Sequence, residues 1–197
     1  MRKIIFLLIF IIASILPQKV FSQVRDTSIF YFTNLAEALK TPDDVRYLDL
    51  KKSGLNSFPN EILQFKNLKH LNLSKNKIDS LPPTIMQLEN LEVLNIAQNK
   101  FKKFPGPICS LKKLRQLIAF KNEIPSFPKE IGNLKNLEIL DLWGNEISAF
   151  PMEISKCEKL KFVDLRVIDI NDNEAEAIQL LLPRTKIMFS PNCNCRN

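Results

Sequence analysis

The sequence predicts an α/β solenoid, in which short strands from successive repeats stack into one parallel sheet between two helical ends. The first observation behind this prediction is a period of 23 residues that recurs in five copies without an insertion. The second is that apolar residues alternate at the start of every copy, which is typical of a short strand with one buried face. A single copy cannot bury its apolar side chains alone, so the copies are expected to stack.

The chain begins with the features of a secretory signal peptide. Arg2 and Lys3 precede an apolar run over Ile4–Ala13, and the small residue Ser22 stands before Gln23. The run is shorter than the roughly 20 apolar residues that a membrane-spanning helix needs. We therefore expect residues 1–22 to be removed, leaving a secreted or periplasmic chain with no membrane span.

Residues 23–44 are predicted to form an N-terminal cap. Asn34 and Glu37 have the spacing of a helix capping pair, and Pro42 marks the end of the helix. The apolar side of that helix would consist of Leu35, Ala38 and Leu39. It would cover the open end of the repeat stack.

The five copies fill residues 45–159. The second reads "LKHLNLSKNKIDSLPPTIMQLEN" from Leu68, and the others start at Val45, Leu91, Leu114 and Leu137. They resemble the leucine-rich repeat family, in the form LxxLxLxxNxLxxLPxxIxxLxx, and the whole chain looks like a secreted bacterial member. The resemblance covers residues 45–165. It implies a right-handed solenoid with a parallel sheet on the concave side and short helical or irregular segments on the convex side.

Two columns of residues are expected to shape the turns. The asparagine column can both donate to and accept from backbone groups that the turn leaves unpaired, and it is interrupted by Ser53 and Ile168 at the two ends. The proline column fixes φ where the chain begins its return. The columns are Asn76, Asn99, Asn122 and Asn145, and Pro59, Pro82, Pro105, Pro128 and Pro151.

Residues 160–197 are predicted to hold a degenerate sixth repeat, a C-terminal cap and a cysteine-containing tail. Asn171 and Glu174 form a second capping pair, followed by an apolar helical face that Pro183 closes. Ile187–Phe189 can add a final strand. The segment Val167–Asp169 departs from the repeat pattern, because it lacks the asparagine.

Composition limits the chemistry. The three cations Arg2, Lys3 and Lys19 leave with the signal peptide and no acid does, so the formal net charge of +7 falls by three to +4. This mild excess, with no basic helical stripe, argues against nucleic acid. One histidine and four cysteines do not make a zinc site, and we expect no cofactor. Cys157 and Cys109 are expected to be unpaired, with Cys193 and Cys195 free to pair in the tail.

The concave face gives the candidate site. Positions three, five, seven and eight of each repeat, counted from its first apolar residue, should point outward from the sheet. In repeats four to six these positions gather apolar side chains around Trp143, the one tryptophan of the chain, with charges beside them. The predicted partner-binding residues are Ile118, Phe120, Lys121, Ile139, Asp141, Trp143, Phe162, Asp164 and Arg166.

An exposed apolar cluster of this kind usually marks a protein interface. The sequence therefore predicts a monomeric, non-enzymatic module that binds a protein partner with its concave face. One alternative is recognition of envelope glycan or lipopolysaccharide by the aromatic residues with Lys121 and Arg166. A weaker alternative is a hydrolase that uses Asp141 and Asp164 as acid and base.

Overall fold

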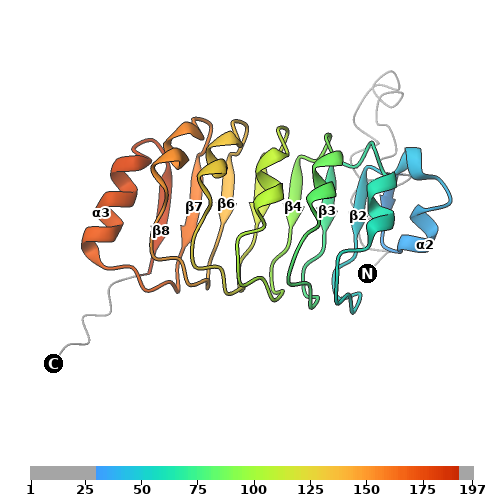
Figure 1. Ribbon diagram of the computed structural model, residues 1–197, viewed down its shortest axis with the longest axis horizontal. Helices are drawn as coiled ribbons and strands as arrows, with labels where there is room; N and C mark the ends of the chain where they lie inside the picture. The colour runs from blue at the N-terminus through green and yellow to red at the C-terminus, as the bar shows by residue number, and fades with distance from the viewer. Residues whose placement is uncertain (1–29, 191–197) are drawn as a thin grey trace, which may run out of the picture.

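The computed structural model describes residues 30–190, which form an elongated stack of repeats (Figure 1). Eight parallel strands pair in chain order to make a single sheet. They are β1 (Tyr31–Phe32), β2 (Tyr47–Asp49), β3 (His70–Asn72), β4 (Val93–Asn95), β5 (Gln116–Ile118), β6 (Ile139–Asp141), β7 (Phe162–Leu165) and β8 (Lys186–Phe189). The predicted α/β leucine-rich repeat solenoid is thus confirmed.

The period of the sequence sets the register of the sheet. From β2 to β7, residues one repeat apart are partners across neighbouring strands, as Tyr47 is to His70 and His70 to Val93. In β2 to β6 the middle residue is buried and its two neighbours are half-buried. The middle residues stack into one core column, which consists of Leu48, Leu71, Leu94, Leu117, Leu140 and Val163.

Short 3-10 helices run along the side of the stack opposite the sheet (Figure 1). Each follows a residue of the proline column, whose φ values lie between −67° and −73°. These values match the angle that the proline ring imposes, so the column does begin the return segment as predicted. The helices are η4 (Asn60–Gln64), η5 (Pro83–Gln87), η6 (Gly106–Ser110), η7 (Lys129–Asn133) and η8 (Met152–Lys156).

The turn after each strand depends on a left-handed residue at position eight, with φ from 52° to 65°. Only Gly144 in this column is a glycine, so the conformation is strained at the other five positions. The backbone N–H of the left-handed residue donates a hydrogen bond to the next repeat. That of Lys121, for example, donates to the carbonyl oxygen of Trp143 at 2.7 Å. The column consists of Lys52, Lys75, Gln98, Lys121, Gly144 and Val167.

The asparagine column forms the predicted ladder. The side-chain amide of Asn122 donates to the carbonyl oxygens of Ile96 at 3.1 Å and Ala119 at 3.0 Å. Its oxygen accepts the backbone N–H of Phe101, in the preceding repeat, at 3.2 Å. Asn76, Asn99 and Asn145 make equivalent bonds. Each amide therefore joins the turn of its own repeat to that of the repeat before.

The described N-terminal end has a strand, an α-helix and a 3-10 helix before the first repeat. Asn34 caps α2 (Leu35–Ala38) by accepting the N–H of Glu37 at 3.1 Å, and η3 (Pro42–Asp44) begins at the predicted proline. Strand β1 was not expected from the sequence. It lies before the first repeat and extends the sheet by pairing with β2.

The C-terminal end contains both predicted elements. Helix α3 (Asp172–Leu181) has a complete capping box between Asn171 and Glu174, and β8 completes the sheet. The departure at Val167 does not change the path of the chain, because Val167 adopts the left-handed conformation of its column with φ 57°. Ile168 is buried where repeats two to five place asparagine. In the other repeats the N–H of the left-handed residue donates to a backbone carbonyl oxygen of the next repeat, whereas the Val167 N–H donates to the Ser190 hydroxyl at 2.6 Å.

The predicted signal peptide, Cys193 and Cys195 lie outside the described residues. In the stretch from Phe30 to Ser190, no helix has the length and apolar character needed to cross a bilayer.

Candidate functional site on the concave face

Trp143 lies in the C-terminal half of the concave face, at position seven of its repeat. The ring of Phe120, at the same position one repeat earlier, lies 5.7 Å from the indole between centroids and is tilted by 57°. The ammonium of Lys121 lies 4.4 Å from the indole centroid, within the range of a cation–π contact. The three side chains form one unit that spans two repeats.

The expectation that these apolar residues are openly exposed is wrong. Ile118, Phe120, Ile139, Trp143 and Phe162 are all half-buried. Equivalent positions on adjacent parallel strands are only about 4.8 Å apart, so large side chains at those positions shield one another. The cluster therefore leaves only part of each apolar side chain accessible.

The structure brings the predicted residues together in rows at positions three, five and seven, with Lys121 at position eight. Ile139 and Phe162 are register partners at position three, and Ile118 and Asp141 are partners at position five. Ile118 also lies beside the N-terminal half of the face. We call the five apolar residues, with Lys121, the tryptophan patch; they are Ile118, Phe120, Lys121, Ile139, Trp143 and Phe162.

Asp164 does not lie open on the face as expected. Its side chain is 6% exposed and is held by Arg166, whose Nη2 donates to Oδ2 at 2.7 Å. Burial alone would raise the pKa of Asp164, but the hydrogen bonds and charge of Arg166 outweigh burial and lower it. Met188 of β8 is its register partner on the outer side, so the added strand shields it. Asp164 is therefore an internal partner of Arg166, while the Arg166 side chain remains half exposed.

Asp141 lies next to Asp164, as its register partner. Burial raises the pKa of Asp141, and the charge of Asp164 raises it further. One oxygen of each carboxylate accepts a backbone N–H two residues later, from Trp143 at 3.3 Å and from Arg166 at 3.1 Å. The pair thus helps to hold the turn.

The same bond recurs along position five. Asp49, Asn72 and Asn95 accept the backbone N–H groups two residues later at 2.9 to 3.0 Å. The column interrupts this pattern only at Ile118, which has no such acceptor. The acidic and amide residues at position five therefore stabilise the turns. This structural role accounts for these residues without a catalytic one.

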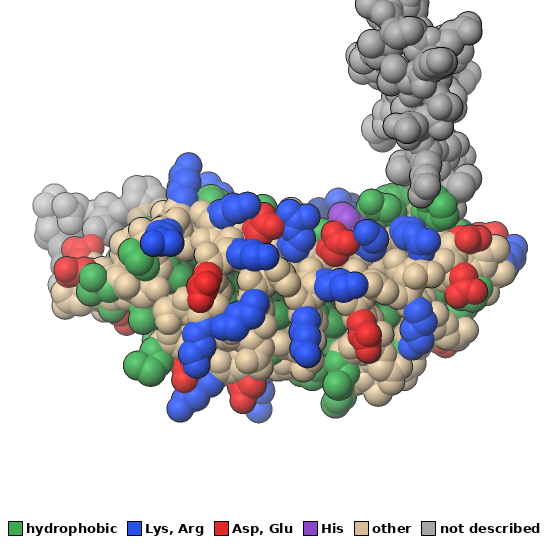
Figure 2. All heavy atoms as spheres, turned by 90° about the horizontal axis from the view of Figure 1, so that it is seen from above, with side chains coloured by type: hydrophobic (Ala, Val, Ile, Leu, Met, Phe, Trp, Pro, Cys, Tyr) green, Lys and Arg blue, Asp and Glu red, His purple; other side chains and the backbone are tan. Residues whose placement is uncertain are grey.

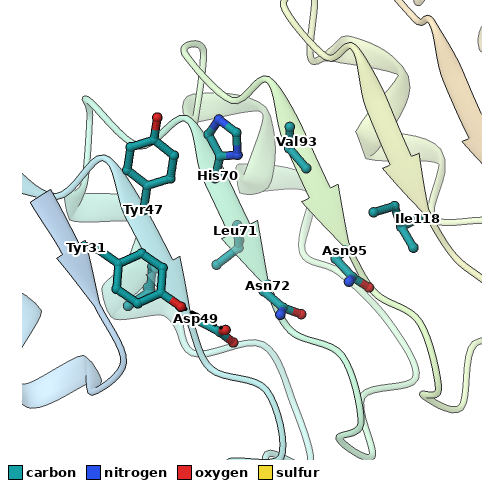
Figure 3. A pocket seen from close by; sticks show the side chains of 10 residues that line it. Tyr31, Tyr47, Asp49, His70, Leu71, Asn72, Val93, Asn95 and Ile118 are labelled. Carbon is teal, nitrogen blue, oxygen red and sulfur yellow. Dashed lines mark hydrogen bonds between the residues drawn. The ribbon is translucent and has the colours of Figure 1, made fainter. Parts of the chain in front are cut away.

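A second feature, which sequence analysis did not identify, is a hollow over β1 to β5 in the N-terminal half of the face (Figure 3). It encloses about 230 Å³. The phenol of Tyr31 donates to Asp49 Oδ2 at 3.1 Å, and the rings of Tyr47 and His70 lie 4.4 Å apart between centroids. The hollow is lined by Tyr31, Tyr47, Leu48, Asp49, His70, Leu71, Asn72, Val93, Asn95 and Ile118.

Two groups in this hollow are kept neutral. Burial lowers the pKa of His70, and the charge of Lys69 adds to this, against the opposing charge of Glu92. Burial raises the pKa of Tyr31, as do the charge of Asp49 and its hydrogen bond. Asp49 is then the only lining residue with a formal charge near neutral pH.

Charged side chains elsewhere on the surface are mixed. Figure 2 shows Lys and Arg side chains interspersed with Asp and Glu across the visible face. At position two, Glu138 contacts Arg115 at 2.8 Å and Lys161 at 2.7 Å, bridging three repeats. Hydrogen bonds from Arg115 and Lys161 lower the pKa of Glu138 to about 2.

The described cysteines are interior groups. Cys109 and Cys157 are free and buried, and the Cys157 thiol donates to the Ile131 carbonyl oxygen at 3.3 Å. Burial raises the pKa of Cys109 to about 12 and that of Cys157 to about 11. In the part of the chain that the structure describes, no group of three or more His, Cys, Asp or Glu residues is placed to hold a metal ion.

Comparison with known proteins agrees with the fold. A family model described as a leucine-rich repeat region matches residues 36–123, and a leucine-rich repeat model matches residues 136–157. The chain belongs to the leucine-rich repeat family. No curated protein matches the sequence.

Similar solved structures include the following three. A leucine-rich repeat protein of Leptospira interrogans is 33% identical over 81% of this chain and 48% of its own, with a TM-score of 0.63. The leucine-rich repeat ectodomain of the receptor kinase GASSHO1/SCHENGEN3 from Arabidopsis thaliana, in complex with CASPARIAN STRIP INTEGRITY FACTOR 2, is 26% identical over 74% and 18%, with a TM-score of 0.60. The plant peptide hormone receptor RGFR1, in complex with RGF2, is 29% identical over 75% and 24%, with a TM-score of 0.62. This chain thus spans about half of the Leptospira protein and under a quarter of each plant receptor.

Proposed function

We propose that this protein is a secreted, non-enzymatic module that binds a protein partner with its concave face. The observation that carries the proposal is the tryptophan patch, in which Trp143 contacts Phe120 and Lys121 on the concave face. Tryptophan near a cation, at the centre of a half-buried apolar cluster, has the composition of a binding hot spot. Two similar structures were solved with a bound partner, which supports this use of the fold.

The arrangement of the carboxylates favours binding over hydrolysis. Asp141 and Asp164 each hold a backbone N–H, and Asp164 is also paired with Arg166. A general acid and base need to reach a substrate, and Asp164 is almost wholly covered.

A capture experiment tests the proposal. The full chain and its Trp143→Ala variant would be immobilised and exposed to cell-envelope and culture-medium fractions, with Met152→Ala as the control. Met152 is 71% exposed and lies in η8, on the side opposite the sheet. We expect a protein that both the parent chain and Met152→Ala retain and that Trp143→Ala loses.

The affinity for the captured protein, measured with the parent chain and with Trp143→Ala, gives the contribution of Trp143 to binding. Truncating a hot-spot side chain costs at least about 2 kcal/mol, which is roughly thirtyfold in Kd. Equal retention by all three proteins would contradict the proposal. Retention of polysaccharide alone, weakening steeply with ionic strength, would replace the protein partner with an anionic glycan.

Secretion has its own test. Mass spectrometry of the native protein should find Gln23 at the N-terminus, since we place cleavage after Ser22. A native protein that still begins at Met1 would contradict processing without affecting the binding proposal.

A further inference from the structure

The hollow over β1 to β5 is about the size of one side chain. Its volume of about 230 Å³ is below the roughly 300 to 1,000 Å³ of pockets that hold a whole small-molecule ligand. Figure 3 shows the Tyr31 ring beside Asp49, with Tyr47 and His70 next to each other on adjacent strands. The hollow therefore exposes the Asp49 carboxylate on the open sheet, and aromatic rings border it.

Asp49 retains capacity to accept hydrogen bonds. Its Oδ1 accepts the backbone N–H of Lys51 at 2.9 Å, and its Oδ2 accepts the Tyr31 phenol at 3.1 Å. A carboxylate offers about four acceptor sites, so each oxygen has about one left. None of the ion pairs found among residues 30–190 involves Asp49. Its negative charge is thus not neutralised within the described chain.

The rings add to the attraction for a cation. A tyrosine ring attracts a cation through its face, and the Tyr47 ring lies in the hollow, 4.4 Å from the His70 ring between centroids. His70 is neutral near pH 7 and does not repel a positive group. Asn72 and Asn95 supply uncharged acceptors along the remaining wall.

We propose that this hollow is a subsite for an arginine side chain on the protein segment that the concave face binds, which rests on the proposed function. Arginine fits better than lysine because its planar guanidinium can donate to both carboxylate oxygens while it stacks on a ring. A lysine ammonium is a compact point charge, so it cannot pair with both carboxylate oxygens and also stack on a ring.

The distance from Asp49 to Trp143 specifies the segment further. Asp49 lies in β2 and Trp143 follows β6 by two residues; these strands are four spacings apart, or about 19 Å at about 4.8 Å each. An extended chain advances about 3.3 Å per residue, so this span corresponds to about six residues. The partner segment thus carries an arginine about six positions from an apolar anchor.

The chain provides a specific reporter for each half of the face. His70 is its only histidine and lines the hollow, and Trp143 is its only tryptophan and lies in the patch. The probe is N-acetyl-arginine methylamide, titrated into the full chain while NMR follows the His70 ring signals. The matched neutral probe is N-acetyl-citrulline methylamide, which has nearly the same shape and no charge.

The variant is Asp49→Asn. Asn72 and Asn95 occupy the same position in the next two repeats and make the same backbone bond, at 3.0 Å, so an asparagine at position 49 keeps the turn intact. The control is Asp79→Asn, because Asp79 is exposed and lies outside the lining of the hollow. Unchanged melting temperatures would show that both variants fold.

The arginine probe should shift the His70 signals saturably in the parent chain and in Asp79→Asn. Its affinity should fall at least tenfold in Asp49→Asn, and the citrulline probe should bind at least tenfold more weakly than arginine. Equal binding of both probes, equal binding of N-acetyl-lysine methylamide, or no effect of Asp49→Asn would overturn the arginine subsite.

The readouts separate this inference from the proposed function. If the arginine probe leaves His70 unchanged while Trp143→Ala still abolishes partner capture, the subsite is wrong and the binding module stands. If the arginine probe acts through Asp49 but capture does not depend on Trp143, the proposed function is wrong in its site and the subsite stands as a separate cation site.

Discussion

Lys121 and Trp143 come from neighbouring repeats, and the ammonium of the first lies 4.4 Å from the indole centroid of the second. Lys121 occupies the left-handed position of its turn, with φ 52°. The residue after Trp143 is Gly144, where an added Cβ would lie 3.5 Å from the Lys121 Cγ. That distance is an ordinary van der Waals contact, so glycine is favoured at position 144 by its φ of 65° and not by a lack of space beside Lys121.

Replacing Lys121 with alanine should uncover Trp143. The cation–π contact is worth about 0.5 to 1 kcal/mol at an exposed site, so the free energy of unfolding should fall by no more than about that amount. Quenching of Trp143 fluorescence by acrylamide should increase. Lys75→Ala is the control, because Lys75 occupies the same turn position with φ 58° and lies two repeats away. Equal quenching in both variants would show that Lys121 does not cover the ring in solution.

Asn122→Ala should lower stability by about 1 to 3 kcal/mol, since it leaves buried turn groups without a partner. The lost bonds include those to Ile96 and Ala119. Thermal and urea unfolding would measure the change. The exposed Asn133 in η7 provides the control, and its alanine variant should unfold like the parent. Two indistinguishable curves would mean that water replaces the ladder.

Gly132→Ala should be destabilising by about 1 to 3 kcal/mol, because overpacking forces the backbone to shift. A Cβ at Gly132 would lie 2.5 Å from the Glu153 carbonyl oxygen in the next return segment. Gly106→Ala is the matched control, since a Cβ there meets nothing within 4 Å. Differential scanning calorimetry should separate the two variants, and equal melting temperatures would refute the close contact between η7 and η8.

The ion bridge at Glu138 should make stability sensitive to acid. The folded pKa of Glu138 is lowered to about 2 from 4.5, so the bridge contributes stability above pH 4.5. That contribution is lost as the pH falls through about 2. Glu138→Gln should therefore show a smaller loss of stability between those pH values in urea titrations.

Glu123 is the control for that experiment, because the ion pair that it forms within residues 30–190, with Lys102, is longer at 3.7 Å. Glu123→Gln should reproduce the acid dependence of the parent chain. If Glu138→Gln does so as well, solvent screening has removed the contribution of the bridge.

Cys109 and Cys157 should react slowly with a thiol reagent in the folded protein. Both are buried and the thiolate is the reactive form, while their pKa values are raised to about 12 and 11. Labelling at pH 8 followed by peptide mass analysis would give each rate. Modification of Cys157 as fast as in urea-unfolded protein would contradict its burial.

Much of the fold could be predicted from the sequence because the repeat is a local pattern. Every copy places the same residue types at the same positions, so the pairing of Leu71 with Leu94 follows from the period alone. The ladder at Asn122 and the helix cap at Asn171 depend on residues close in sequence or one repeat apart. Such contacts can be predicted from the spacing of residue types along the sequence.

The site was less predictable because it depends on groups outside the repeat pattern. Strand β1 brings Tyr31 onto Asp49 from before the first repeat, and no period places it there. Asp164 is covered because β8 pairs beyond it and because Arg166 folds back onto it. The sequence does contain one usable signal: Asp or Asn stands at position five in most repeats, and in the first two repeats Tyr47 and His70 stand two residues before it.

The asparagine ladder, in which each amide serves its own repeat and the one before, also turns the solenoid into a molecular ruler. Removing residues 91–113, one complete period, would preserve the ladder, because Asn122 would then serve the turn that Asn99 serves now. Asp49 and Trp143 would be retained and would lie about 4.8 Å closer together, although the hollow would lose Val93 and Asn95 from its lining. The number of repeats thus sets the length of the segment that can reach from Asp49 to Trp143.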